Sequence, residues 1–315
     1  MTKIYTLLLA LSLVGSVVAQ KLTVGIAGLT HDHVRGFMNQ YKKGEVKLVG
    51  IVEPNAKLVE QFKKMHQLPD SLFFNTLASM LEHTKPDAVL AYNAISEHLS
   101  VVEACAPKGI SVMVEKPLAT TVMQAERIKA LADQYHIQVL TNFETTWYAS
   151  YHQVKEMVDA DYVGSIRKMV VHDGHQGPKE IGCSDEFLEW LTDPIKNGGG
   201  ALVDFGCYGA NLMTWLMKGK TPIAVTAITR RIKPDVYPKV DDDATILLEY
   251  ADATGIIEAS WNWPFGIKDL EVFGKSGYLH ALNGSMLQER KKDTYDNVSV
   301  KPPIYSNNLV YLADV

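Results

Sequence analysis

The sequence predicts an α/β protein in which a doubly wound parallel sheet is followed by a second unit with a mostly antiparallel, open sheet. Short apolar runs alternate with helical segments in the first half, whereas longer alternating segments separated by Gly, Asp and Pro fill the second half. Hydrophobic residues make up 47% of the chain and charged residues 21%, which is typical of a globular protein. The length of 315 residues favours two domains.

Repeated strand–helix units account for the first half. Buried strands are predicted over five short apolar runs, 22–28, 47–53, 87–92, 111–115 and 137–141. Helices are predicted between them, over 31–41, 55–66, 77–83, after Ser96, and over 121–135. Right-handed crossovers would make the sheet parallel and place a ligand at the carboxyl ends of its strands.

The pattern of apolar and polar residues changes from about residue 150 onward. Alternating segments predict strands over 165–171, 223–232, 244–250, 255–263 and 270–273. A helix over 151–159 precedes them, and one helix over 201–215 interrupts them. This pattern favours an antiparallel sheet with one face open to solvent or to a partner.

Charge and cysteine content exclude several classes of protein. Lys and Arg number 31 against 36 Asp and Glu, so the net charge of −5 argues against a nucleic-acid partner. The three cysteines, Cys105, Cys183 and Cys207, show no CxxC spacing, which disfavours a disulfide framework or a structural zinc site.

Residues 1–19 have the pattern of a secretory signal peptide. Lys3 precedes an uncharged run over 4–18, and Val18-Ala19 offers small or compact residues before a cleavage site. We therefore expect an exported protein, periplasmic or extracellular, with no membrane attachment after cleavage. A buried N-terminal helix or an uncleaved anchor are the alternatives.

The first predicted strand-to-helix turn partly matches a dinucleotide-binding fingerprint. That fingerprint requires glycine at 28, 30 and 33, but only Gly28 is present, with Thr30 and His33 in the other places. The helix N-terminus can still accept a pyrophosphate, and the Thr30 hydroxyl can add a contact. Glu53 ends the second predicted strand, where a carboxylate binds a ribose hydroxyl and repels a 2′-phosphate, which favours NAD over NADP. The alternative is a generic turn with an acid capping a strand end.

Two further stretches change this interpretation. One is Val114-Glu115-Lys116-Pro117, and the other is the glycine run that begins at Gly198 and continues through Asp204 to Tyr208. Together with the turn at Gly28, they resemble the glucose–fructose oxidoreductase and inositol dehydrogenase family (Gfo/Idh/MocA). The resemblance runs from about residue 22 to the last residue.

The resemblance implies a Rossmann dinucleotide-binding domain over 20–145 and an α/β substrate and oligomerisation domain over 146–315, whose open sheet mediates homo-oligomers. It implies that Lys116 contacts the substrate and the nicotinamide ribose, and that Asp204 and Tyr208 supply acid–base groups at the reacting carbon. The family more often has His at the last of these positions; Tyr is like the glucose–fructose branch. The turn and the resemblance together give this set of cofactor-binding residues: Gly25, Gly28, Thr30, His31, Glu53, Asn93, His98, Glu115 and Lys116.

These residue types suit the oxidation of an alcohol. The carbinol loses a hydride to the nicotinamide and a proton to a protein group whose pKa lies near the working pH. We expect a neighbouring ammonium to lower the pKa of Tyr208 and burial to lower that of Lys116. The four-residue spacing of Asp204 and Tyr208 predicts one face of a helix near its start, and the glycines before it let substrate approach the backbone.

The sequence therefore predicts an NAD(P)-dependent oxidoreductase acting on a hydroxyl or ketone of a sugar or cyclitol, with NAD as cofactor and no metal ion. Export conflicts with this function, because free NAD is scarce outside the cytoplasm. A redox-neutral glycosidase or epimerase, or a two-substrate oxidoreductase, would avoid the conflict by keeping NAD tightly bound. A non-catalytic sugar-binding relative is the other alternative, which the incomplete glycine fingerprint supports.

Four further features of the sequence are less specific than these motifs. His172 and His175 form an H-x-x-H pattern that we assign to substrate lining or solvent exposure rather than to a metal. The run 241–243 of three aspartates predicts a solvated turn. Four aromatic residues are candidates for stacking on a sugar or for the core: Trp147, Tyr148, Trp261 and Trp263. The final residues 308–315 resemble the opening of a longer helix, which suggests a fragment or a shortened family member.

Overall fold

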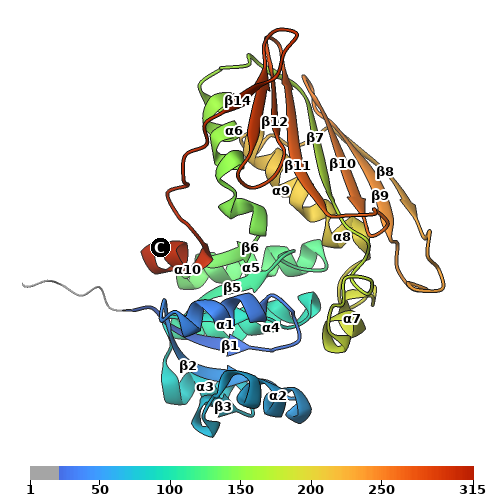
Figure 1. Cartoon of the computed structure of the whole chain (residues 1–315). Helices are drawn as coiled ribbons and strands as arrows, with labels where there is room; N and C mark the ends of the chain where they lie inside the picture. The colour runs from blue at the N-terminus through green and yellow to red at the C-terminus, as the bar shows by residue number, and fades with distance from the viewer. Residues whose placement is uncertain (1–20) are drawn as a thin grey trace, which may run out of the picture.

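The computed structural model describes residues 21–315, so the predicted signal peptide over 1–19 lies outside the described residues. The chain forms two sheets, one in each half, with helices packed against both (Figure 1). Within the part described, no helix combines the length and the apolar character needed to cross a membrane. The predicted fold class is confirmed, because a parallel sheet is followed by a mostly antiparallel one.

The first sheet is parallel and has six strands in the order β3-β2-β1-β4-β5-β6. Its strands are β1 (Thr23–Ala27), β2 (Lys47–Val52), β3 (Phe73–Phe74), β4 (Ala88–Ala91), β5 (Ser111–Glu115) and β6 (Val139–Asn142). β1, β4 and β5 are almost wholly buried, since helices cover both faces. The strand order reverses between β1 and β4, and this is the point at which such sheets open a ligand crevice.

Three of the five helices packed against the first sheet begin where a side chain accepts hydrogen bonds from the free N–H groups of the first turn. The five helices are α1 (Val34–Lys42), α2 (Ala56–His66), α3 (Leu77–Thr84), α4 (His98–Cys105) and α5 (Val122–Tyr135). Asn55 caps α2, Thr76 caps α3, and Thr121 caps α5. α1 has no such side-chain cap, and its first N–H groups donate instead to the backbone oxygens of residues 31–33.

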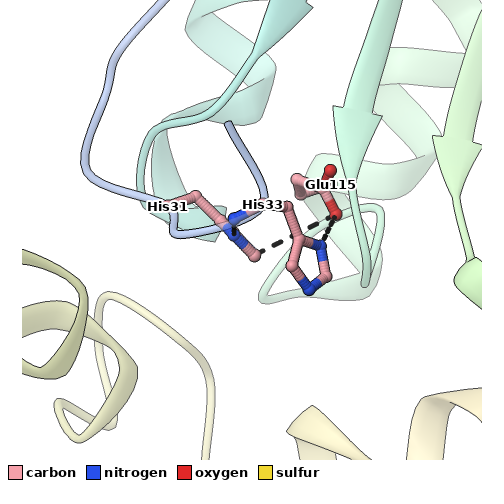
Figure 2. Close-up of side chains that lie close together, drawn as sticks. All are labelled: His31, His33 and Glu115. Carbon is pink, nitrogen blue, oxygen red and sulfur yellow. Dashed lines mark hydrogen bonds and ion pairs between the residues drawn. The ribbon is translucent and has the colours of Figure 1, made fainter. Parts of the chain in front are cut away.

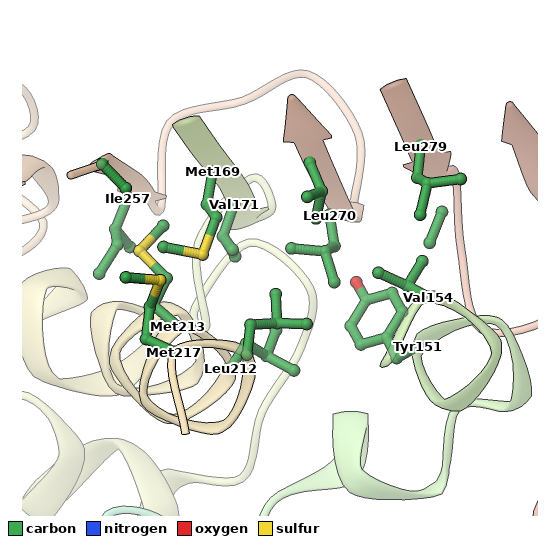
Figure 3. Close-up of a cluster of buried hydrophobic side chains, with 14 of the residues drawn as sticks. Tyr151, Val154, Met169, Val171, Leu212, Met213, Met217, Ile257, Leu270 and Leu279 are labelled. Carbon is green, nitrogen blue, oxygen red and sulfur yellow. The ribbon is translucent and has the colours of Figure 1, made fainter. Parts of the chain in front are cut away.

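The second sheet has eight strands in the order β14-β13-β12-β11-β7-β10-β9-β8, and only the β7–β10 pair is parallel. Its strands are β7 (Ile166–Gly174), β8 (Ala224–Arg230), β9 (Asp243–Glu249), β10 (Thr254–Ser260), β11 (Ile267–Gly274), β12 (Tyr278–Ala281), β13 (Leu287–Arg290) and β14 (Asp296–Val298). α6 (Ala149–Asp159) and α9 (Gly206–Leu216) pack on one face (Figure 3). There Met169, Val171 and Leu270 meet Leu212 and Met213 in a continuous apolar core.

Several elements differ from the prediction. The helix predicted over 201–215 is broken at Phe205 into α8 (Ala201–Asp204) and α9. α10 (Asn308–Asp314) forms where residues 308–315 resembled the opening of a helix, whereas α7 (Asp185–Leu191) and the strands β12 to β14 were not predicted. These elements are three to seven residues long, too short for hydrophobic periodicity to stand out.

Two short helices, α7 and α10, join the second half of the chain to the first sheet. The chain returns from β14 to α10, whose Leu309 and Leu312 belong to the same apolar core as Val24 and Phe37 (Figure 1). α7 lies against the turn after β1, where Asp32 accepts a hydrogen bond from the Ser184 N–H at 2.8 Å. The crevice at the strand ends is therefore bounded by residues from both halves.

Candidate active site

Lys116 and Asp204 form a buried ion pair between the two sheets. Lys116 directly follows β5, and Asp204 ends α8. The Lys116 ammonium contacts Asp204 Oδ1 and also donates to the Asp204 backbone oxygen at 2.9 Å. Trp261 Nε1 donates to the other carboxylate oxygen at 3.0 Å. Each charged side chain is only 7% exposed, so this pair fixes the two halves at one point.

Tyr208 joins this pair through its ring. The Lys116 Nζ lies 5.2 Å from the ring centroid, and the Lys268 Nζ lies 4.6 Å from it. The ring is 1% exposed and is flanked by two ammonium groups. Lys116, Asp204 and Tyr208 therefore converge, as the motifs indicated. The two ammonium groups contact the ring of Tyr208.

The expected pKa shifts of Lys116 and Tyr208 are wrong. Burial alone lowers the pKa of the Lys116 ammonium, but the adjoining Asp204 carboxylate outweighs burial and raises it. Burial, followed by the nearby Asp173 carboxylate, raises the pKa of Tyr208 well above its ordinary value. At neutral pH, Lys116 is thus a cation and Tyr208 a neutral phenol.

A second charged group adjoins this pair and was missed in the sequence. Lys268 from β11 pairs with Glu144, and its Nζ lies 4.0 Å from Asp173 Oδ1 on β7. Asp173 is 1% exposed, and its Oδ1 has no hydrogen-bond partner in the described structure. Burial raises the pKa of Asp173 well above its usual range. The only sequence signal was its place inside the H-x-x-H segment, which drew attention to the histidines instead.

The two histidines of that segment have different surroundings. The His172 side chain lies on one face of β7 and that of Val171 on the other face. His172 Nδ1 is 2.6 Å from Asp269 Oδ1. The His175 ring packs edge-on against Phe205 at 4.9 Å and accepts a hydrogen bond from the Gly177 N–H at Nδ1. Burial lowers the pKa of His175, so it is neutral and presents Nε2–H near the Lys116–Asp204 pair.

A groove of 440 Å³ leads toward this cluster from the first domain. Its wall includes His33, Asn142, Glu144 and Trp147. Glu144 lines the groove and also holds Lys268, so it connects the open space with the buried side chains. The Trp147 indole donates to Asn142 Oδ1 at 3.3 Å, which orients the ring in the groove wall.

β1 and the turn after it contain one glycine required by its backbone conformation and one required by packing. Gly28 has φ +85°, and a Cβ there would lie 2.6 Å from the Asn93 Cβ. Gly25 lies inside β1, where a Cβ would lie 2.5 Å from the Met80 Cε. The missing side chain of Gly25 accommodates Met80, and its predicted contact with the cofactor stays a prediction.

Glu53 lies at the end of β2 as predicted. Its carboxylate accepts hydrogen bonds from the Leu29 N–H at 2.7 Å and the Asn55 N–H at 2.8 Å. Burial raises the pKa of Glu53. Glu53 also lines a 230 Å³ pocket with Gly28, Thr30 and Asn93, which α7 closes on its far side. The carboxylate thus holds two turns in place beside the predicted ribose position.

Two side chains at the crevice have a buried polar atom without a hydrogen-bond partner in the described part of the chain. Asn93 Oδ1 and His98 Nε2 lack hydrogen-bond partners among residues 21–315. His98 is fixed through Nδ1, 3.1 Å from the Leu118 oxygen, and burial lowers its pKa to about 4. Buried polar atoms of native proteins are normally paired, so these two orphaned atoms fit a bound ligand with hydrogen-bonding groups such as a dinucleotide.

His31, His33 and Glu115 form a cluster with three ligand-type atoms within 4.8 Å of one another (Figure 2). Glu115 Oε2 lies 2.9 Å from His33 Nδ1 and 4.0 Å from His31 Nε2. The His33 N–H donates to His31 Nδ1, which leaves the proton of neutral His31 on Nε2. In this ring orientation Nε2 is a hydrogen-bond donor, whereas a metal ligand needs a free lone pair.

His31, which was predicted to bind the cofactor, has a packing role in the fold. Its ring is 1% exposed and lies 4.6 Å from the ring of Phe187 and 5.4 Å from that of Trp190, both on α7. His31 therefore packs α7 onto the turn. Glu115 is held by His33 and by the Asn142 amide at 2.9 Å, and it adjoins the turn rather than open space.

The aspartate run has a structural role that the sequence pattern did not reveal. Asp241 accepts hydrogen bonds from the N–H groups of Gly200 and Leu202, and Asp242 accepts from those of Ile232 and Lys233. Asp242 is fully buried, so the predicted solvated turn is wrong. A Cβ at Gly200 would overlap the Asp241 carbonyl, so this glycine is needed for the approach of protein backbone rather than of substrate.

The fold and the site define a two-domain protein with a dinucleotide-type crevice and a buried lysine–aspartate pair across it. Residues 22–143 match the family model of the oxidoreductase family with an NAD-binding Rossmann fold, and residues 151–280 match that of the GFO/IDH/MocA C-terminal domain. The two matches cover most of the chain. The protein belongs to the Gfo/Idh/MocA oxidoreductase family, as the motifs indicated.

Known proteins resemble the chain at low identity. It is 22% identical over 205 residues to trans-1,2-dihydrobenzene-1,2-diol dehydrogenase of Xenopus tropicalis, covering 65% of this chain and 57% of that protein. Aldose–aldose oxidoreductase from Caulobacter crescentus, complexed with glycerol, superposes with a TM-score of 0.78 at 21% identity, covering 94% and 88%. An inositol dehydrogenase homolog from Azotobacter vinelandii, complexed with NAD+, gives 0.80 at 17% identity, covering 94% and 84%. The structural likenesses show a common fold.

Proposed function

We propose that this protein is an NAD-dependent oxidoreductase that interconverts a hydroxyl and a ketone on a sugar or cyclitol. The buried Lys116–Asp204 pair carries the proposal, because it lies beside the crevice that contains the orphaned atoms of Asn93 and His98. The relative named for a dihydrodiol and the structures named for an aldose and an inositol enzyme support a polyhydroxylated substrate.

The cofactor-binding residues follow from the same geometry. Asn93 and His98 offer their free atoms, Thr30 lines the pocket at the turn, and Glu53 faces the ribose. A bound nicotinamide supplies the hydride acceptor or donor. Lys116, held as a cation by Asp204, stabilises negative charge on the substrate oxygen as its proton leaves.

Acidic side chains support NAD rather than NADP. The pocket at the turn contains four glutamates and one lysine, namely Glu53, Glu97, Glu186, Glu189 and Lys196. A 2′-phosphate in this pocket would face several carboxylates, whereas a free ribose hydroxyl can donate to Glu53.

Binding and turnover measurements test the function. Titration calorimetry should detect NAD binding to the purified protein, and Lys116→Met should bind NAD similarly but lose turnover on sugars and cyclitols. Met keeps the unbranched stem and removes the charge. Failure to bind any dinucleotide would favour a non-catalytic sugar-binding relative, and an active Lys116→Met variant would remove the catalytic assignment.

A permanently held cofactor is the second candidate, and α7 favours it. Phe187 and Trp190 pack over His31 at the turn where the pyrophosphate is expected. A cover of this kind slows cofactor exchange, as a redox-neutral glycosidase or epimerase requires. Heat-denatured protein should then release nicotinamide dinucleotide into the supernatant in near-stoichiometric amount, whereas a freely exchanging dehydrogenase would release little.

Export and self-association complete the proposal. The basic start and uncharged run within residues 1–19 support export to the periplasm or beyond, and N-terminal sequencing of the protein from each cell fraction tests it.

The open face of the second sheet supports a homo-oligomer, since half-buried Val170 and Ile256 lie side by side on it.

A further inference from the structure

Asp173 is a buried carboxylate at the centre of the site, and among residues 21–315 its Oδ1 has no hydrogen-bond partner. Strand pairing places Asp173 opposite Lys268, and its Oδ1 remains 4.0 Å from the Lys268 ammonium, beyond a direct hydrogen bond. Lys268 is instead held by Glu144. A carboxylate that is 1% exposed and left with an unpaired oxygen is costly, so its retention calls for a functional explanation.

Charged and titratable groups face Asp173 from every element around it. These are Lys268 on β11, Lys116 after β5, Asp204 on α8, Glu144, Tyr148, Tyr151 on α6, and Cys207 and Tyr208 on α9. Burial raises the pKa of Asp173 most strongly, the two lysines lower it, and Asp204 and Glu144 raise it again. The net rise brings this carboxyl closer to neutral pH than an ordinary aspartate.

Tyr208 is less suited to accept a proton. Burial and the Asp173 carboxylate raise its pKa above the ordinary value, so the phenol stays protonated. Both ammonium contacts are with its ring face, at 4.6 Å from Lys268 and 5.2 Å from Lys116. A neutral phenol is a hydrogen-bond donor that does not titrate near neutral pH.

We propose that Asp173 is the residue that takes the proton of the substrate hydroxyl and returns it in the reverse reaction. The inference rests on the proposed oxidoreductase function. In oxidation, the substrate O–H bond breaks and its proton bonds to the Asp173 carboxylate, while the C–H electron pair leaves as hydride to an oxidised nicotinamide. The carbinol loses two electrons, the nicotinamide gains them, and Asp173 then passes its proton to water. Lys268 lies between Asp173 and Glu144, and Glu144 lines the groove.

Steady-state kinetics of Asp173→Asn and Tyr208→Phe distinguish the two candidate groups, with D-glucose and myo-inositol as probe substrates and NAD as oxidant. Asp173→Asn should lose about 100-fold or more in kcat and the acidic limb of the pH profile, with the Kd for NAD unchanged. Tyr208→Phe should keep that limb. Asp269→Asn is the matched control and should behave as wild type. Asp269 lies on β11 beside β7, but it contacts His172 on the face of the sheet away from Asp173. Asp173→Asn with near wild-type kcat, or loss of the limb only in Tyr208→Phe, would overturn the proposal.

Infrared titration provides a readout that needs neither cofactor nor turnover. The wild type minus Asp173→Asn difference spectrum should show a protonated carboxyl band that persists well above the pH at which ordinary aspartates ionise. A band that disappears near pH 4 would contradict the proposal. If the wild type oxidises neither probe, the proposed function loses support on those substrates while the titration still decides the state of Asp173.

Discussion

The Lys116–Asp204 pair shows what one buried contact contributes. Both groups give up hydration, and each compensates the other through direct contact, with Trp261 satisfying the second carboxylate oxygen. Breaking such a pair from one side is costly, since it leaves an uncompensated charge in the interior.

Removal of the Lys116 charge should destabilise the fold. Lys116→Met leaves Asp204 buried and unpaired, so we expect the free energy of unfolding to fall by about 3 kcal/mol. Adding Asp204→Asn should recover part of this loss, because a neutral amide costs less to bury. Urea denaturation of the two single variants and the double variant gives the coupling energy. Additive effects would contradict the pairing.

Asp173 should make stability fall as the pH rises. Its folded-state pKa is raised above the ordinary value of 3.8, so the folded chain binds this proton more tightly than the unfolded chain. Below about pH 4 both states are protonated and the burial penalty is absent. Above that pH the penalty grows by about 1.4 kcal/mol for each pH unit until the folded-state pKa is reached. Urea denaturation at pH 4.5 and 7.5 should therefore show Asp173→Asn gaining stability over wild type at the higher pH. An equal difference at both values would show that the pKa is not raised.

At the scale of elements, the loop before α8 is built around close backbone approach. Gly200 touches the Asp241 carbonyl, and the Asp241 side chain then holds the first N–H groups of α8. This arrangement orients Asp204 only one helical turn later. The glycine run is therefore a structural requirement of the site rather than a surface for substrate.

Alanine at Gly200 should disrupt this element. The added Cβ overlaps backbone that has no flexible side chain to move, so we expect a loss of roughly 2–3 kcal/mol in unfolding free energy and of Lys116-dependent turnover. Gly36→Ala in α1 is the control, because nothing lies within 4 Å of its Cβ and helix propensity favours alanine by up to about 1 kcal/mol. Calorimetric melting of both variants tests this, and similar Tm changes would argue against it.

α7 should influence cofactor choice through its charges. The double variant Glu186→Gln, Glu189→Gln removes two carboxylates from the pocket at the turn. Repulsion between a carboxylate and a phosphate charge about 8 Å apart in water costs about 0.5 kcal/mol for each pair of unit charges. Without these carboxylates, NADP should bind several-fold more tightly, while the affinity for NAD changes little. The gain should shrink in high salt. Fluorescence titration with both dinucleotides measures it, with Glu82→Gln on α3 as control; no change in NADP affinity would argue against this role.

At the scale of the whole molecule, the second sheet has two unlike faces. Val171 and Ile257 point into the core under α9, whereas their neighbours Val170 and Ile256 point away from it. Leu247 pairs with Ile256 and extends this apolar row across a third strand. An apolar row on an open sheet face is typical of an interface between copies.

Charged residues on this face should dissociate the proposed oligomer. Val170→Lys combined with Ile256→Lys places two like charges in the apolar row, so light scattering should show monomers where the wild type forms oligomers. Circular dichroism should stay unchanged. Met123→Lys, at a 77% exposed position on α5, is the control. A monomeric wild type would contradict the proposed interface.

The sequence predicted most of the long elements, because their periodicity is local. It also predicted that Lys116, Asp204 and Tyr208 converge, through motifs whose meaning came from family resemblance. It missed Asp173, Lys268 and Glu144, which lie on three separate elements and become neighbours only through strand pairing and the packing of the two halves. The pKa directions were wrong for the same reason, because burial and partners depend on the whole fold.

By itself, the sequence determined the fold class and the family. It also singled out Lys116, which follows β5, and Asp204, which precedes α9. Those properties are encoded in local patterns of apolar residues, glycines and capping side chains. Only the tertiary structure decided which charges are paired, which carboxylate is left without a partner, and that α7 covers the turn after β1. Desolvation and distance set these properties, and both arise when segments far apart in the chain pack together.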